Sequence, residues 1–118
     1  MKEERRLYPR AVTDWPVIID TGGGLLSGRA LDISVGGAFI CCQSFFPFRR
    51  SGTVHMALFD VPLLEGSLPV RAQVVMTNIH YADNELRPQG MGVRFLDISE
   101  VDRELISKLV LSIIEEAA

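Results

Sequence analysis

The sequence predicts a mainly β protein, an antiparallel barrel or sandwich of about six short strands followed by a C-terminal α-helix. Two observations support this prediction. Short apolar runs with a two-residue period fill most of the chain, and turn-forming residues separate them. Near residue 99 the period changes to the three- and four-residue steps that mark one face of a helix.

The strand pattern is clearest at Val70–Met76, where apolar residues at even positions alternate with more polar neighbours. Five similar runs occur elsewhere, at Pro16–Asp20, Leu26–Ile33, Ala38–Cys42, Thr53–Phe59 and Met91–Leu96. Glycine, serine or asparagine is present in each connection, and no helical pattern interrupts the series. Tight connections without intervening helices favour antiparallel neighbours.

The helical pattern begins near Ser99, which is followed three residues later by Asp102, as in a capping box. Apolar residues then recur on one face, at Leu105, Ile106, Leu109, Val110, Ile113 and Ile114. We expect this face to pack on the strands, because such stripes mostly mark burial. Packing against a second subunit, in a homodimer, is the open alternative.

Length and composition indicate one folded domain. The chain has 118 residues, of which 47% are hydrophobic and 23% charged, enough to form a core. No apolar run approaches the roughly 18 residues of a membrane span, and no apolar stretch follows the charged start as in a signal peptide. We therefore expect a stand-alone cytoplasmic protein of one domain, 1–118, with a flexible arm at 1–12, a β-barrel or sandwich at 15–97 and a helix at 99–117.

Positive charge is concentrated at the start of the chain. Residues 1–10 carry a local charge of +2 in a chain of net charge −3, so the remainder carries −5. A nucleic-acid-binding protein usually has a broad basic face, so nucleic acid is not the expected partner. A local cluster fits a small anionic ligand better than a long polyanion.

The cysteines and histidines do not indicate a metal site. Cys41 and Cys42 are adjacent, so in a strand they point to opposite faces and do not pair easily with each other. His55 and His80 lack the paired spacing of zinc ligands. We expect no metal and no cofactor.

The basic stretch contains Arg6 and Arg10, separated by three residues. A guanidinium group is a planar fork of donors that binds phosphate at two points, matches O6 and N7 of guanine, and stacks on purines. Pro9 fixes its own backbone φ angle and disfavours helix at Tyr8, so the segment is expected to be extended. The alternative is an ordinary solvated tail.

A second polar stretch, "DISVGG" at 32–37, lies where a predicted strand gives way to a turn. Asp32 and Ser34 alternate along the backbone, so both can lie on one face. A carboxylate accepts the N1–H and N2–H edge of guanine, and a serine hydroxyl serves base or phosphate. Gly36 and Gly37 permit positive φ and close approach of a ligand. The alternative is a turn in which Asp32 and Ser34 satisfy neighbouring backbone groups.

Taken together, the two stretches resemble the PilZ family of bacterial cyclic di-GMP receptors. Arg6 and Arg10 match its Arg-x-x-x-Arg motif, and Asp32, Ser34 and Gly37 match its Asp-x-Ser-x-x-Gly motif. The strand at 70–76 and "GMGVRF" at 90–95 also look like the family's later strands. One departure is Met76, where many relatives carry tryptophan.

The resemblance implies a six-stranded antiparallel barrel with a C-terminal helix and cyclic di-GMP as ligand. Asp32 and Ser34 would read base edges, while Arg6 and Arg10 would hold phosphates and Hoogsteen edges. Arg5, directly before the first motif, implies capture of two stacked ligand molecules. Binding would order the arm and transmit a signal by a conformational or interaction change, to a downstream protein that the sequence does not name.

Three alternatives stay open at this point. The chain could be a PilZ-like interaction module that does not bind the nucleotide. A nucleotide hydrolase would need a nucleophile–base pair or a metal set, and neither is evident, so we expect no enzyme. A single-stranded nucleic-acid barrel would need a basic groove with aromatic platforms, which the acidic remainder of the chain disfavours.

Overall fold

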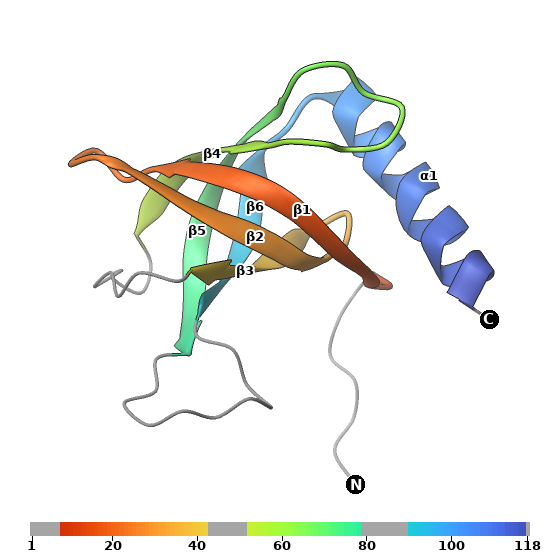
Figure 1. Cartoon of the computed structure of the whole chain (residues 1–118), viewed down its shortest axis with the longest axis horizontal. Helices are drawn as coiled ribbons and strands as arrows, with labels where there is room; N and C mark the ends of the chain where they lie inside the picture. Colours follow the sequence, from red (N-terminus) through yellow and green to blue (C-terminus); the bar gives the residue numbers. More distant parts are fainter. Residues whose placement is uncertain (1–7, 43–51, 79–89, 118) are drawn as a thin grey trace, which may run out of the picture.

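The computed structural model describes residues 8–42, 52–78 and 90–117, except for the side chains of 76–78. Six strands form a closed antiparallel barrel in the order β1-β2-β3-β6-β5-β4, and one helix follows them (Figure 1). The elements are β1 (Ala11–Asp20), β2 (Leu25–Ile33), β3 (Gly37–Cys42), β4 (Thr53–Leu58), β5 (Leu68–Asn78), β6 (Gly90–Asp97) and α1 (Glu100–Ala117). The predicted β class, the antiparallel barrel and the C-terminal helix are thus confirmed.

The barrel closes because β1 pairs on both of its sides. It runs antiparallel to β2 along most of its length and to β4 at its C-terminal end, where Ile18 faces Ala57. A sheet closed in this way has no free edge. The opposite side of the barrel is completed by β3 pairing with β6, and this pair carries the candidate site described below.

The first strand begins at Ala11, five residues before the predicted start at Pro16 and inside the predicted arm. Its odd-numbered residues from Ala11 to Ile19 all point into the barrel, and its even-numbered residues are exposed or half-buried. The first two inward positions of β1 are occupied by Ala11 and Thr13. One side chain is small and the other polar, so the alternation of apolar and polar residues is hard to recognise there in the sequence. Thr13 is accommodated because its hydroxyl donates a hydrogen bond to the Ala30 carbonyl oxygen, 2.7 Å away.

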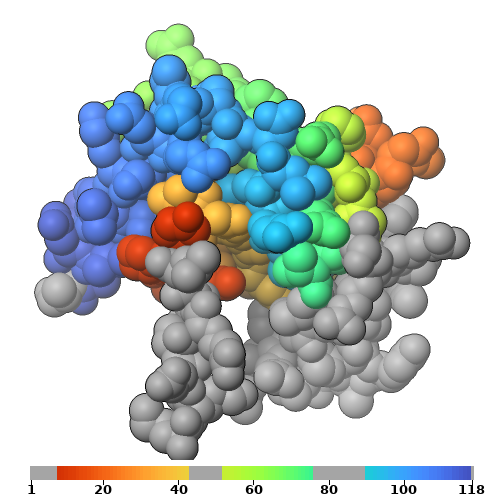
Figure 2. Space-filling model, turned by 180° about the vertical axis from the view of Figure 1, so that it is seen from behind, coloured from red at the N-terminus to blue at the C-terminus, as the bar shows by residue number. Residues whose placement is uncertain are grey.

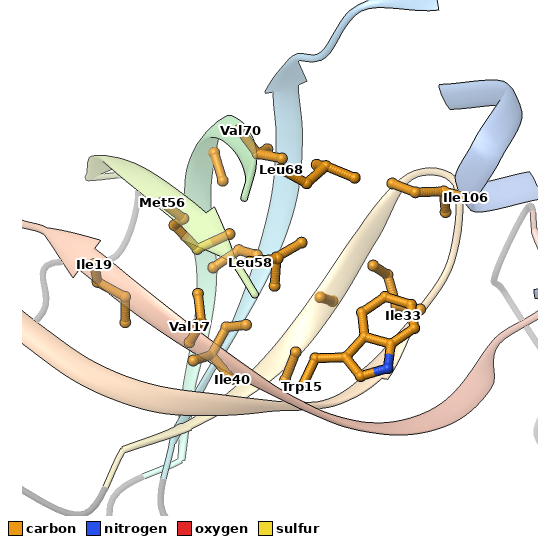
Figure 3. Close-up of a cluster of buried hydrophobic side chains, with 14 of the residues drawn as sticks. Trp15, Val17, Ile19, Ile33, Ile40, Met56, Leu58, Leu68, Val70 and Ile106 are labelled. Atoms are coloured by element: carbon orange, nitrogen blue, oxygen red, sulfur yellow. The ribbon is translucent and has the colours of Figure 1, made fainter. Parts of the chain in front are cut away.

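The barrel interior is filled by alternating aliphatic side chains, with Trp15 near the end that faces α1 (Figure 3). Ile19, Ile40, Leu58 and Met91, from four different strands, are among the largest fully buried side chains. Burying a side chain of this size contributes about 1.5–3 kcal/mol each, so the interior is a rigid support for its outer surface.

The helix covers one open end of the barrel. Ile106 is fully buried and points from α1 toward the interior, beside Leu68 (Figure 3), and Leu109 and Val110 are also buried. The remaining members of the predicted stripe, Leu105, Ile113 and Ile114, are partly buried against the same core. The helix therefore packs on the barrel, and its apolar face forms part of the hydrophobic core.

The start of α1 is fixed by Ser99, as the sequence predicts. The Asp102 backbone N–H donates to Ser99 Oγ at 3.1 Å, and the Arg103 N–H donates to the Ser99 carbonyl oxygen at 2.8 Å. These bonds satisfy donors that the first helical turn leaves unpaired. They also fix the backbone position of Arg103 in the first turn.

The two cysteines are free thiols and differ in environment. Cys42 lies in the core and Cys41 is half-buried on the outer side of β3. Burial, with a smaller contribution from Cys41, raises the pKa of the Cys42 thiol to about 11. The described residues contain no group of three or more histidine, cysteine, aspartate or glutamate residues that could hold a metal ion, and His80 lies outside them.

Within the described ranges, no helix combines the length and apolar character that a membrane span requires.

Candidate functional site

The candidate site is centred on the turn between β2 and β3. The Ser34 N–H donates to the Gly37 carbonyl oxygen at 2.8 Å, which closes the turn. The Ser34 hydroxyl oxygen also accepts bonds from the N–H groups of Gly36 and Gly37, at 3.1 and 3.2 Å. A serine that bonds backbone groups two and three residues ahead holds the turn in one shape.

These bonds define what Ser34 does in the structure. Its side chain is buried, with 6% of the residue exposed, and its oxygen is engaged within the turn. The alternative interpretation from the sequence, in which Ser34 satisfies neighbouring backbone groups, describes the observed contacts. A ligand-binding role for Ser34 stays a prediction, although the residue lines the hollow described below.

The turn is also attached to β6. The Phe95 N–H donates to the Gly36 carbonyl oxygen at 2.9 Å, and Gly37 faces Arg94 in the β3–β6 ladder. A side chain on Gly37 would place its Cβ 2.2 Å from the Val93 carbonyl oxygen, a distance that does not occur between unbonded atoms. Glycine is therefore required there so that β3 and β6 can approach.

This finding corrects the expectation about glycine conformation. Neither Gly36 nor Gly37 has a positive φ angle; among the described glycines only Gly22 and Gly66 do. At Gly36 space is tight but not closed, because a Cβ would lie 3.1 and 3.2 Å from two ring carbons of Tyr8, which is partly exposed. The Tyr8 ring lies on this bare stretch of backbone.

The two sequence motifs meet through an ion pair. Arg10 Nη1 lies 3.1 Å from Asp32 Oδ1, joining residues 22 positions apart in the sequence. Both side chains are partly exposed, at 36% and 30%. The contact brings Arg10 of the first motif beside Asp32 of the second, whereas Arg5 and Arg6 lie outside the described residues. The ligand-binding roles of all four residues stay predictions.

A hollow of about 430 Å³ opens beside the turn. Its described lining comprises Tyr8, Arg10, Ser34, Val35, Gly36, Gly37, Val93, Arg94, Phe95 and Arg103. Of the predicted site residues, Arg10, Ser34 and Gly37 line it directly, and Asp32 is connected to it by its ion pair with Arg10. Figure 2 shows this face, where the start of the described chain lies between the β2–β3 region, β6 and α1.

The lining has an unusual charge. It contains three arginines and no carboxylate among its described members, although the whole chain carries a net charge of −3. Tyr8 and Phe95 add aromatic rings, and Gly36 and Gly37 add backbone that carries no side chain. A hollow of this kind suits a ligand that combines anionic groups with flat rings.

Sequence reasoning did not place Tyr8, Arg94 or Arg103 in the site. The sequence marks Tyr8 only as a residue of the arm at which Pro9 disfavours helix, and Arg94 only as part of "GMGVRF". Alternation in β6 indicates that Arg94 faces outward, which is the one local signal available. Nothing local connects Arg103 with Asp32, since they are 71 residues apart.

Met76, the predicted departure from the family pattern, is in β5 and faces Gly92 of β6. Its side chain lies outside the described part of the molecule.

Comparison with known proteins gives a family and a fold. The model of the PilZ domain family matches residues 4–112. A search of curated proteins found no match. The structure of the Bacillus subtilis inhibitor of motility (MotI/DgrA) is similar, with a TM-score of 0.80 at 15% identity, over 98% of this chain and 54% of that one.

Two further similar structures hold c-di-GMP. The PilZ domain of YcgR from Escherichia coli, with c-di-GMP, has a TM-score of 0.74 at 17% identity, over 97% of this chain and 95% of that one. The MrkH–c-di-GMP complex of K. pneumonia has a TM-score of 0.75 at 20% identity, over 98% and 55%. The chain thus spans about half the length of the MotI and MrkH chains. At these identities the likeness shows the fold alone.

Proposed function

The chain belongs to the PilZ domain family, and from this premise we propose that it is a bacterial cyclic di-GMP receptor that binds its ligand at the hollow beside Arg10 and the Ser34–Gly37 turn. The observation that carries the proposal is the lining of this hollow, with three arginines, two aromatic rings and no described carboxylate. Cyclic di-GMP offers two phosphates and two guanines, the groups that such a lining suits. The two similar structures that hold c-di-GMP support the choice of ligand.

In this proposal the predicted site residues have different roles in binding the ligand. Arg6 and Arg10 bind phosphate oxygens or the O6 and N7 edge of guanine, as planar forks of donors. Asp32 accepts hydrogen bonds from the N1–H and N2–H groups of a guanine. Ser34 and Gly37 keep the turn in the shape that lets a ligand lie against its backbone.

The ion pair between Arg10 and Asp32 has to rearrange when both residues bind ligand. Because both side chains are about one third exposed, such a pair contributes only about 0–1 kcal/mol. Micromolar binding corresponds to about 8 kcal/mol, so this cost is small. In the free protein the pair keeps Arg10 beside the hollow and keeps the Asp32 carboxylate from lying unpaired.

We further propose that the N-terminal arm closes over the bound ligand and that this ordering transmits the signal. Ala11 and Val12, at the end of the predicted arm 1–12, already pair with Ile33 and Asp32 in the barrel. The change should therefore be confined to residues 1–10. Hydrogen exchange should show protection appearing there when cyclic di-GMP is added, and complete protection in the free protein would contradict an arm that closes.

The deciding experiment is calorimetric titration with cyclic di-GMP, with GTP as the control nucleotide. The proposal expects saturable binding of cyclic di-GMP and much weaker binding of GTP. A variant with both Arg6 and Arg10 changed to alanine should lose binding while remaining folded. A folded wild-type protein that does not bind cyclic di-GMP would instead favour the interaction module.

The proposal assigns a receptor role, without catalysis, to a protein acting in the cytoplasm. Cyclic di-GMP incubated with the protein should be recovered unchanged, and any hydrolysis product would count against this role. The downstream partner is a protein that recognises the liganded form.

A further inference from the structure

The hollow contains two arginines that the proposed ligand contacts do not use. Arg94 comes from β6 and Arg103 from α1, and together we call them the β6–α1 wall. Both lie outside the two sequence motifs. On the other side of the turn, Arg10 is neutralised by Asp32 at 3.1 Å. Among the described residues, the partners of Arg94 and Arg103 neutralise their charges less.

The described partner of Arg94 is neutral. Its Nη2 donates a short hydrogen bond to the amide oxygen of Gln73, on the neighbouring strand β5. An amide oxygen fixes the direction of the guanidinium group but does not cancel its charge. Because Arg94 faces Gly37 in the β3–β6 ladder, this charge is held next to the turn.

The described partner of Arg103 is distant. Its Nε lies 3.9 Å from Glu100 Oε1, beyond hydrogen-bond range, and the Glu100 side chain is 91% exposed. An ion pair of this kind is weakened by water and salt. Hydrogen bonds to Ser99 fix the first turn of the helix, so Arg103 leaves α1 from a defined position.

From these contacts we propose that the β6–α1 wall binds a phosphate group of the cyclic dinucleotide, separate from the phosphate or base edge held by Arg10. The inference rests on the proposed function, because it concerns the same ligand. It assigns to Arg94 and Arg103 a direct contact with phosphate oxygens, for which arginine offers two parallel donors. It also places one ligand contact on α1, so the ligand joins the helix to the barrel.

The chain offers a matched control for Arg103. Arg71 is 42% exposed and lies 3.9 Å from the Asp97 carboxylate, so its exposure and ion-pair distance resemble those of Arg103, which is 45% exposed. Arg71 lies on β5 and does not line the hollow. Replacing either arginine by glutamine removes one charge from a similar surface environment.

The test is calorimetric titration of cyclic di-GMP into wild type, Arg103→Gln, Arg94→Gln and Arg71→Gln, at low and at high sodium chloride. Arg103→Gln and Arg94→Gln should each weaken binding about tenfold, whereas Arg71→Gln should bind like wild type. The affinity of the two wall variants should also depend less on salt than that of wild type, because one charge–phosphate contact is gone. Thermal melting of each free variant checks that it is folded.

The outcomes separate the inference from the proposed function. Binding by wild type together with unchanged affinity in both Arg103→Gln and Arg94→Gln would overturn the β6–α1 wall and leave the receptor role standing. An equal loss in Arg71→Gln would overturn it too, because net charge would then account for the effect. Absence of cyclic di-GMP binding by folded wild type would overturn both proposals. If one wall variant does not fold, the other decides.

Discussion

The turn at Ser34–Gly37 and the segment Tyr8–Arg10 border the same hollow, but they are held in different ways. The turn is closed by backbone and side-chain hydrogen bonds and attached to β6 through Gly36. The described contacts of Tyr8–Arg10 are an ion pair between partly exposed side chains and a ring lying on glycine. The turn therefore fixes the shape of the site, whereas the segment supplies charge that can be rearranged at small cost.

This difference has a physical basis. The backbone hydrogen bonds that join the turn to β6 break only when β3 and β6 separate at this end of the barrel, so the turn opens less easily than an exposed side-chain contact. An ion pair at the surface contributes about 0–1 kcal/mol and competes with water. We therefore expect changes in the turn to act on folding, and changes in the segment to act on ligand binding.

The largest expected effect is at Gly37. Gly37→Ala should lower the free energy of unfolding by about 3 kcal/mol, because its Cβ would lie 2.2 Å from the Val93 carbonyl oxygen and force β3 away from β6. Urea denaturation measures the change. Gly23→Ala is the matched control, since nothing lies within 4 Å of a Cβ there. Equal stability of the two variants would contradict a turn fixed by close packing.

The next effect is at Arg10. Arg10→Ala should weaken cyclic di-GMP binding about tenfold to a hundredfold, since hydrogen bonds to charged groups contribute roughly 1.5–3 kcal/mol. The free energy of unfolding should change by less than about 1 kcal/mol, because only a surface ion pair is lost. Calorimetry and urea denaturation of the same protein measure both. A large loss of stability would show that the segment belongs to the rigid part of the site.

The same reasoning applies to Arg6, which lies outside the described residues. Arg6→Ala should weaken binding to a similar degree and leave stability unchanged. An unaltered dissociation constant in the Arg6/Arg10 double variant would remove the arginine arm from the site.

A smaller effect, on ligand preference, is expected at Asp32, which connects the two regions. Asp32→Ala should reduce the preference for cyclic di-GMP over cyclic di-AMP, because adenine lacks the N1–H and N2–H donor edge that the carboxylate accepts. Titration of wild type and variant with both nucleotides measures the ratio of dissociation constants. If wild type does not distinguish the two nucleotides, Asp32 does not read the base.

The smallest effect is expected at Arg5. Its replacement should leave the fold unchanged and alter only the number of cyclic di-GMP molecules bound per chain. Wild type should bind two stacked cyclic di-GMP molecules, because a further guanidinium offsets repulsion among four phosphates and offers another face for stacking. Arg5→Leu should bind one. Calorimetry well above the dissociation constant gives the ratio, and a wild-type ratio of one ligand per chain would exclude the paired mode.

The sequence by itself determined the kinds of elements and the approximate places where they change. The two-residue period predicted every strand, and Ser99 with Asp102 predicted the helix start, because these signals depend on neighbours within one element. It missed the beginning of β1, where small and polar inward residues weaken the alternation. The family resemblance implied that both motifs serve one ligand, but the ion pair between Arg10 and Asp32 could not be predicted from either motif.

The two-residue period does not say how the strands pair or where the helix lies, and only the tertiary structure decided this. A barrel and a sandwich have the same alternation, and only the pairing of β1 with β4 shows that the sheet closes. The same closure brings β6 beside β3 and places α1 over the end of the barrel, so Arg94 and Arg103 reach the hollow that Arg10 also lines. Short-range patterns cannot encode such contacts, since the distance between residues far apart in the chain is set by how all the strands pair.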